Sequence, residues 1–75
     1  MELETKVLLL ALSKRQDGEG TKEVLFQLEN AGALTLKEGK KLLKKLKADG
    51  HLSGEELTLL GIEAARAAEA EFKLP

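Results

Sequence analysis

The sequence predicts one small, mainly α-helical domain that carries a single short β-hairpin. The chain has 75 residues, and independently folding units seldom fall much below about 50 residues, so we expect a single domain over residues 1–75. Leu, Ala, Lys and Glu dominate, whereas β-branched aliphatic residues are few and Tyr and Trp are absent. This composition favours helices over a large sheet. Most glycines fall between the apolar stretches, as they do at joints between helices.

The first predicted helix begins at Leu3 and ends near Arg15. Acidic residues lie near its start and basic residues near its end, as the helix dipole favours. The helix has a second apolar face, so it is either central in the fold or in contact with a partner. Helical spacing predicts an inner face of Leu3, Val7, Leu10 and Ala11, and a second face of Leu8, Leu9 and Leu12.

The second predicted helix begins after the loop 16–20, with Thr21 as its N-cap, and ends near Ala31. Gly32 follows as a left-handed stop. Phe26 lies opposite the inner face, where it either packs under the neighbouring loop or forms an exposed partner contact. The predicted inner face consists of Val24, Leu25, Leu28 and Ala31.

The third predicted helix has the clearest start signal of the chain. Thr35 and Glu38 have the spacing of a capping box, in which each side chain bonds the other residue's backbone amide. Gly50 supplies the stop. Helical spacing divides the rest into an apolar side and a basic side. The apolar side carries Leu36, Gly39, Leu42, Leu43 and Leu46, and the basic side carries Lys37, Lys40, Lys41, Lys44, Lys45 and Lys47.

A hairpin and a fourth helix complete the predicted fold. Gly54-Glu55 separates residues 51–53 from residues 56–58, and Gly in the first position suits a type II′ turn. Thr58 then caps a helix that ends near Phe72, with Leu57 and Ile62 at the spacing of a hydrophobic staple. This helix is rich in alanine, so another helix can approach its backbone closely.

In this order, the elements resemble a winged helix-turn-helix domain, of the kind found in small bacterial or archaeal repressors. Residues 46–52 are similar to the end of a recognition helix followed by the Gly-Leu entry to a wing. Residues 57–61 are similar to the Leu-Thr-x-x-Gly exit from the wing in repressors of the multidrug-resistance type. The resemblance implies that the third helix enters the major groove of DNA and that the wing touches the flanking backbone. The DNA-binding positions that it implies are Thr35, Lys37, Lys40, Lys41, Lys44 and Lys45.

The distribution of charge supports a polyanionic partner. The net charge is −1 overall, but it divides into −2 over residues 1–34, +5 over residues 35–47 and −4 over residues 48–75. The sequence therefore predicts a small regulator or accessory factor whose third helix contacts the backbone of duplex DNA through lysines. A lysine-rich face is also a common way to keep a surface helix soluble.

The main alternative is a winged-helix module that binds another protein and not DNA. The wing tip Gly54-Glu55-Glu56 is acidic, and the basic face offers lysines without the Arg, Asn or Gln side chains that read base edges best. A homodimer would double the phosphate contacts of one domain. The same apolar faces could instead pack on each other within one chain. The predicted dimer or partner contacts are Leu8, Leu12, Phe26, Ala64, Ala68 and Phe72.

Other classes of function find little support in the sequence. His51 is the only histidine and no cysteine occurs, so we expect no enzyme, no cofactor and no metal site. Asp49, His51, Glu55 and Glu56 match no metal-ligand spacing, and no small-molecule substrate is indicated. The longest apolar run is 7–12, well below the roughly 20 residues of a membrane helix. With an acidic N-terminus and no disulfides, the expected location is cytoplasmic.

Overall fold

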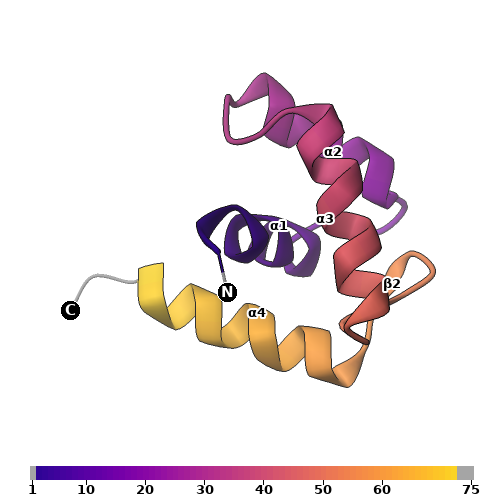
Figure 1. Ribbon diagram of the computed structural model, residues 1–75, viewed down its shortest axis with the longest axis vertical. Helices are drawn as coiled ribbons and strands as arrows, with labels where there is room; N and C mark the ends of the chain where they lie inside the picture. Colours follow the sequence, from indigo (N-terminus) through magenta and orange to yellow (C-terminus); the bar gives the residue numbers. More distant parts are fainter. Residues whose placement is uncertain (1, 73–75) are drawn as a thin grey trace.

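The computed structural model describes residues 2–72 and is mainly helical, with one small antiparallel sheet. Figure 1 shows the order of the elements along the chain. None of the helices in the described part of the chain has the length and apolar character that a membrane span requires. The elements are α1 (Leu3–Ser13), α2 (Thr21–Asn30), α3 (Leu36–Ala48), β1 (Leu52–Ser53), β2 (Glu56–Leu57) and α4 (Leu59–Phe72).

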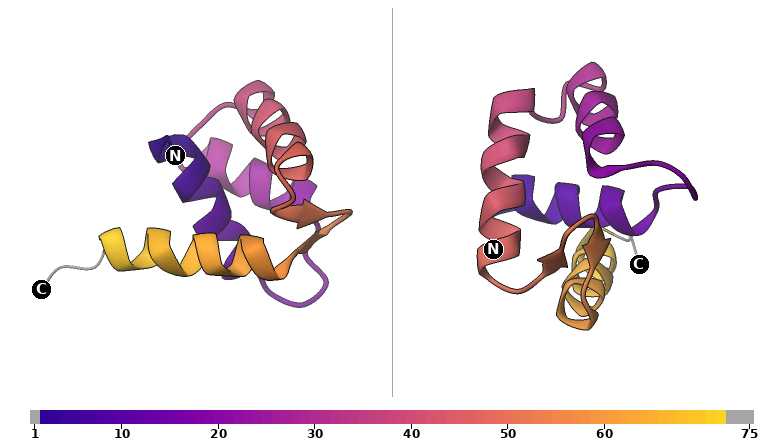
Figure 2. Two further views of the ribbon diagram at one scale, coloured as in Figure 1. Left: turned by 60° about the horizontal axis from the view of Figure 1, so that its bottom comes forward. Right: turned by 90° about the vertical axis from the view of Figure 1, so that its right-hand side faces the viewer.

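Helix α1 lies at the centre of the fold, because α2, α3 and α4 all pack against it. Helix α4 runs along one side of α1, while α3 stands across the pair and leads into the hairpin (Figures 1 and 2). The alternative of a central first helix is therefore confirmed. The core side chains between these helices are Leu8, Leu9, Leu12, Val24, Leu25, Leu34, Leu46, Leu52 and Ala65.

The predicted inner face of α1 is wrong. Leu8 and Leu9 are fully buried, whereas Leu3 is 60% exposed. Both faces of α1 are apolar, so the periodicity of the sequence fits more than one rotation of the helix about its axis. The rotation is set by the three helices that surround α1, and they cover the face that we assigned to the outside.

Both ends of α3 agree with the sequence prediction. The Thr35 hydroxyl accepts a hydrogen bond from the Glu38 amide at 3.1 Å, and the Glu38 carboxylate accepts one from the Thr35 amide at 3.1 Å. At the other end Gly50 has a φ of 83°, and the His51 amide donates to the Leu46 carbonyl. This bond closes the helix as in a Schellman motif. The basic helix is thus held at both ends by local interactions.

The joint between α2 and α3 depends on a close approach at Gly39. A Cβ atom placed on Gly39 would lie 2.4 Å from the Leu25 Cδ2 atom, so no larger residue fits without repacking. The carboxylate of Glu29 on α2 also accepts a hydrogen bond from the Leu36 amide at 2.8 Å. These contacts fix the direction in which α3 leaves α2.

The hairpin and the start of α4 also match the prediction. Leu52 pairs with Leu57 and Ser53 with Glu56, and the turn between them has Gly54 at a φ of 61°. Thr58 caps α4 by accepting from the Gly61 amide at 3.1 Å, and its hydroxyl donates to the Gly50 carbonyl at 2.6 Å. One side chain therefore ties the start of α4 to the end of α3.

The predicted N-cap of α2 is one residue too late. Gly20 is the N-cap, its amide donates to the Glu23 carboxylate at 2.9 Å, and Thr21 is the first helical residue. The Thr21 hydroxyl instead contacts the hairpin, where it donates a hydrogen bond to Glu55 Oε2 at 2.6 Å. A contact between segments far apart in the sequence has replaced the local cap.

Candidate nucleic-acid interface

The lysine side chains of α3 project from the outer surface of the domain. The opposite side of the helix anchors it, because Leu46 is 1% exposed and Leu42 and Leu43 are half-buried against the core. The basic side is not covered by α4, which packs on α1. Exposed side chains are found at Lys37, Lys40, Lys41, Lys44, Lys45 and Lys47.

Two acidic residues of α4, Glu69 and Glu71, are paired with basic residues of α1 or its C-cap and not with α3. Lys6 lies 2.8 Å from Glu71, and Lys14 forms an ion pair with Glu69. Arg15 lies 3.6 Å from Glu56 on the hairpin. Among residues 2–72, no ion pair within 4.0 Å involves a lysine of α3. The basic face thus keeps its charge, while the basic residues of α1 neutralise part of the surrounding acid.

Two of the six lysines have acidic surroundings. Lys41 lines a small recess together with Glu2, Glu4 and Glu38. Hydrogen bonds from the backbone and then the side chain of Thr35 lower the pKa of Glu38, and the charge of Lys41 lowers it further. At the other end of the helix, Lys47 is one of the smaller causes that lower the pKa of Glu55.

The remaining lysines form the least neutralised part of the face. Lys37, Lys40 and Lys44 follow each other at spacings of three and four residues, which brings their side chains to neighbouring positions on one side of a helix. Lys45 lies in the last turn, near the negative end of the helix dipole. Thr35 belongs to the predicted set as well, but its hydroxyl is used in the cap of α3.

The hairpin tip turns its carboxylates back toward the loop between α1 and α2. Glu55 accepts from Thr21, and Arg15 donates to the Glu55 carbonyl oxygen while it approaches the Glu56 carboxylate. The hydrogen bond from the Thr21 side chain is the main cause that lowers the pKa of Glu55. The side chain of Glu56 remains 85% exposed, so negative charge persists at the tip.

Sequence reasoning missed the cluster that holds the hairpin. The side chain of Arg15 is only 14% exposed and lies between the end of α1 and the hairpin. The only sequence signal for this cluster was Arg15 itself, a basic residue at the end of a predicted helix, where basic residues ordinarily lie on the surface. The partners Thr21 and Glu55 stand 34 residues apart in the sequence, so no local pattern joins them.

The structure contradicts three of the predicted dimer or partner contacts. Leu8, Leu12 and Ala68 are 0%, 2% and 1% exposed, because the faces of α1 and α4 pack on each other within one chain. Ala64 is half-buried against the same core. Phe26 and Phe72 are 44% and 43% exposed, so only these two of the proposed contacts present large apolar surface. For Phe26 the expectation of packing under a loop is not met.

Comparison with known proteins found no relative of this chain. No protein-family model, no curated protein sequence and no solved structure matches the chain. No group of three or more potential ligand residues within 2–72 has the geometry of a metal site. The candidate site therefore rests on the geometry and charge of α3.

Proposed function

We propose that the protein is a small winged-helix DNA-binding protein in which α3 contacts the backbone of duplex DNA. The observation that carries the proposal is the exposed row of Lys37, Lys40 and Lys44, without an acidic partner within 4.0 Å among residues 2–72. Ammonium groups in such a row release counterions from a polyanion when they meet its phosphates.

The mechanism that follows is mainly electrostatic. A helix rigidly fixed by its leucine side and by its capped ends can approach a groove with its lysines already positioned. Lysine is a flexible point charge and lacks the planar fork of arginine, so we expect contacts with phosphate and little reading of base edges. The proposed role is a regulator or accessory factor with weak sequence preference, acting in the cytoplasm, where the DNA of a bacterial or archaeal cell lies.

A second copy of the chain would strengthen this weak binding. Two domains double the phosphate contacts and set a spacing between half-sites of about one DNA turn. Because Leu8, Leu12 and Ala68 belong to the core, the exposed Phe26 and Phe72 are the remaining candidates of the predicted set for such a contact.

Fluorescence anisotropy with a random-sequence DNA duplex at low salt tests the proposal. We expect a dissociation constant below about 100 µM, as for other non-specific DNA binding. The variant carrying Lys37→Gln, Lys40→Gln and Lys44→Gln should lose most of this affinity. The matched control removes the same number of charges elsewhere, by changing Lys6, Lys14 and Lys22 to Gln, and should bind nearly as the native chain does.

A protein-interaction module is the second candidate. It is favoured by the exposed Glu56 at the hairpin tip, which would repel phosphate, and by Leu59 and Leu60, which are 73% and 51% exposed at the start of α4. If no DNA binding is detected up to about 100 µM, or if the two triple variants bind equally, the DNA-binding proposal is wrong and this candidate replaces it.

A further inference from the structure

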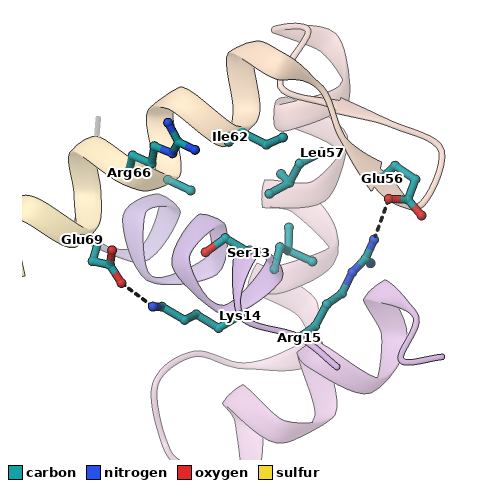
Figure 3. A pocket seen from close by; sticks show the side chains of 10 residues that line it. Ser13, Lys14, Arg15, Glu56, Leu57, Ile62, Arg66 and Glu69 are labelled. Atoms are coloured by element: carbon teal, nitrogen blue, oxygen red, sulfur yellow. Dashed lines mark ion pairs between the residues drawn. The ribbon is translucent and has the colours of Figure 1, made fainter. Parts of the chain in front are cut away.

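We propose that an open cavity between α1, β2 and α4 binds a short aliphatic carboxylate. The cavity has a volume of about 450 Å³, at the lower end of the range found for small-ligand sites. Figure 3 shows it between the end of α1, the hairpin and the middle of α4, from Ile62 to Glu69. None of the six lysines of α3 lines it, so this site is independent of the proposed DNA-binding face.

The apolar part of the cavity is aliphatic. Leu12 and Ala65 belong to the core, and both line the cavity, so its inner wall continues the hydrophobic interior. Leu57 and Ile62 complete the apolar lining, and Ile62 is still 39% exposed. A hydrocarbon chain placed there would cover this exposed surface and gain the free energy of apolar burial. The lining residues within the described part of the chain include no aromatic ring, so none of them selects for stacking of a planar ligand.

Two arginines supply the polar recognition. Arg15 lies on the α1 side and Arg66 on the α4 side (Figure 3). The Nη1 atom of Arg15 is buried and has no hydrogen-bond partner among the described residues. The side chain of Arg66 also has no ion pair within 4.0 Å with any of residues 2–72. The Nη2 atom of the Arg15 guanidinium already contacts Glu55 and Glu56. Buried polar groups in native proteins nearly always have partners, so the unpartnered Nη1 atom of Arg15, a residue that lines the cavity, indicates a missing acceptor.

The balance of charge around the cavity selects the kind of acceptor. Among residues 2–72, Lys14, Arg15 and Arg66 face Glu56 and Glu69, which leaves one excess positive charge. A single carboxylate matches that excess, and its planar oxygens suit the guanidinium fork. A phosphate with nearly two charges would be repelled by the glutamates and would leave the apolar lining uncovered. A monocarboxylate with an aliphatic chain satisfies both parts of the cavity.

Hexanoate is a suitable probe because it joins an aliphatic chain to a carboxylate. Acetate, which lacks the longer aliphatic chain, and hexanol, which lacks the carboxylate, are the controls. Titration of the ¹⁵N-labelled full chain followed by backbone amide shifts should show saturable changes at the end of α1, in β2 and in the middle of α4, from Ile62 to Glu69. We expect a dissociation constant of about 1 mM, as for other ligands with so few atoms, and affinities at least about tenfold weaker for acetate and hexanol.

Arg66→Gln is the test variant because Arg66 is exposed and its replacement leaves the core intact. We expect it to weaken hexanoate binding at least about fivefold, since it removes a charge-assisted contact. Lys22→Gln, which removes an exposed charge on α2, should bind hexanoate as the native chain does, and so should the triple variant of Lys37, Lys40 and Lys44.

The proposal is overturned if hexanoate gives no saturable shifts, or if hexanol binds as tightly as hexanoate. It is also overturned if Arg66→Gln binds unchanged, or if the shifts fall on α3 and vanish in the triple lysine variant. That last result would identify simple anion binding to the basic face. Loss of DNA binding in the triple variant with hexanoate binding retained separates the two proposals.

Discussion

The hydroxyl of Thr21 donates a hydrogen bond of 2.6 Å to Glu55 Oε2, and so joins the first turn of α2 to the tip of the hairpin. Arg15 adds a second link by donating to the carbonyl oxygen of Glu55. The two-residue strands are too short to hold a stable hairpin by themselves. These side-chain contacts therefore fix the position of the hairpin relative to α2.

The contact between Thr21 and Glu55 predicts a dependence of stability on pH. The Thr21 side chain lowers the pKa of Glu55 from its ordinary value of 4.5. A carboxyl group whose pKa is lowered in the folded state stabilises the fold above its unfolded pKa, and this stabilisation is lost as the pH falls through the folded pKa. Denaturant unfolding between neutral pH and about pH 3 should show the free energy of unfolding falling below about pH 4.5, and Thr21→Val should reduce that fall.

The matched control for this prediction is Ser53→Ala, which removes an exposed hydroxyl from the same hairpin. It should leave the pH dependence as in the native chain. Glu19 and Glu38 also have lowered pKa values, through hydrogen bonds with Gln16 and Thr35, so Thr21→Val should reduce the acid destabilisation without abolishing it. An unchanged pH profile in Thr21→Val would show that the hydrogen bond does not form in solution.

Gly61→Ala should destabilise the protein, although alanine is the better helix former. In an ordinary helix the change would stabilise by about 1 kcal/mol. Here the added Cβ would lie 2.0 Å from the carbonyl oxygen of His51, which belongs to the backbone and cannot move away alone. We expect a loss of about 3 kcal/mol or more, measured by chemical denaturation.

Ala67→Gly in the exposed part of the same helix serves as the control, and it should cost only about 1 kcal/mol. A native-like or higher stability of Gly61→Ala would mean that α4 does not meet the end of α3 as the structure has it.

Leu12→Ala should lower the free energy of unfolding by about 2–5 kcal/mol, because the side chain is 2% exposed and its removal leaves a cavity. Leu59→Ala, at a position that is 73% exposed, should change the stability by less than about 0.5 kcal/mol. Sedimentation of both variants checks the alternative that Leu12 is a contact between two copies of the chain. If Leu12→Ala changed the association state while the stability stayed native, Leu12 would be a contact between copies and not part of the core.

The number of lysines that meet phosphate should appear in the salt dependence of DNA binding. With three or four contacts, the logarithm of the binding constant should fall with the logarithm of the salt concentration with a slope of about −3. The triple glutamine variant of Lys37, Lys40 and Lys44 should bring this slope close to zero. A slope that is equally steep in that variant would assign the contacts to other basic residues.

Local signals in the sequence predicted most of the elements. The capping box at Thr35, the left-handed glycines Gly32 and Gly50, the turn at Gly54 and the cap at Thr58 all lie where the structure has them. Each depends on residues within a few positions of one another, and such interactions are encoded almost entirely by the local chain. The exposure of the lysines on α3 was predictable for the same reason, since one helix carries both the apolar and the basic side.

Tertiary structure alone decided which face of α1 is buried and what Thr21 binds. The apolar residues of α1 surround the helix, so the local sequence fits several rotations of comparable energy, and the choice between them depends on the volume offered by α2, α3 and α4. The Thr21 hydroxyl could cap its own helix or bond the hairpin. It bonds the hairpin, because it donates to Glu55, which lies 34 residues away in the sequence. The sequence by itself determined the helices, both ends of α3, the start of α4 and the basic face of α3, because these arise from neighbouring residues. Packing between distant segments formed the core, the Arg15 cluster and the cavity beside it. The energies of such contacts cannot be inferred from a short stretch of sequence.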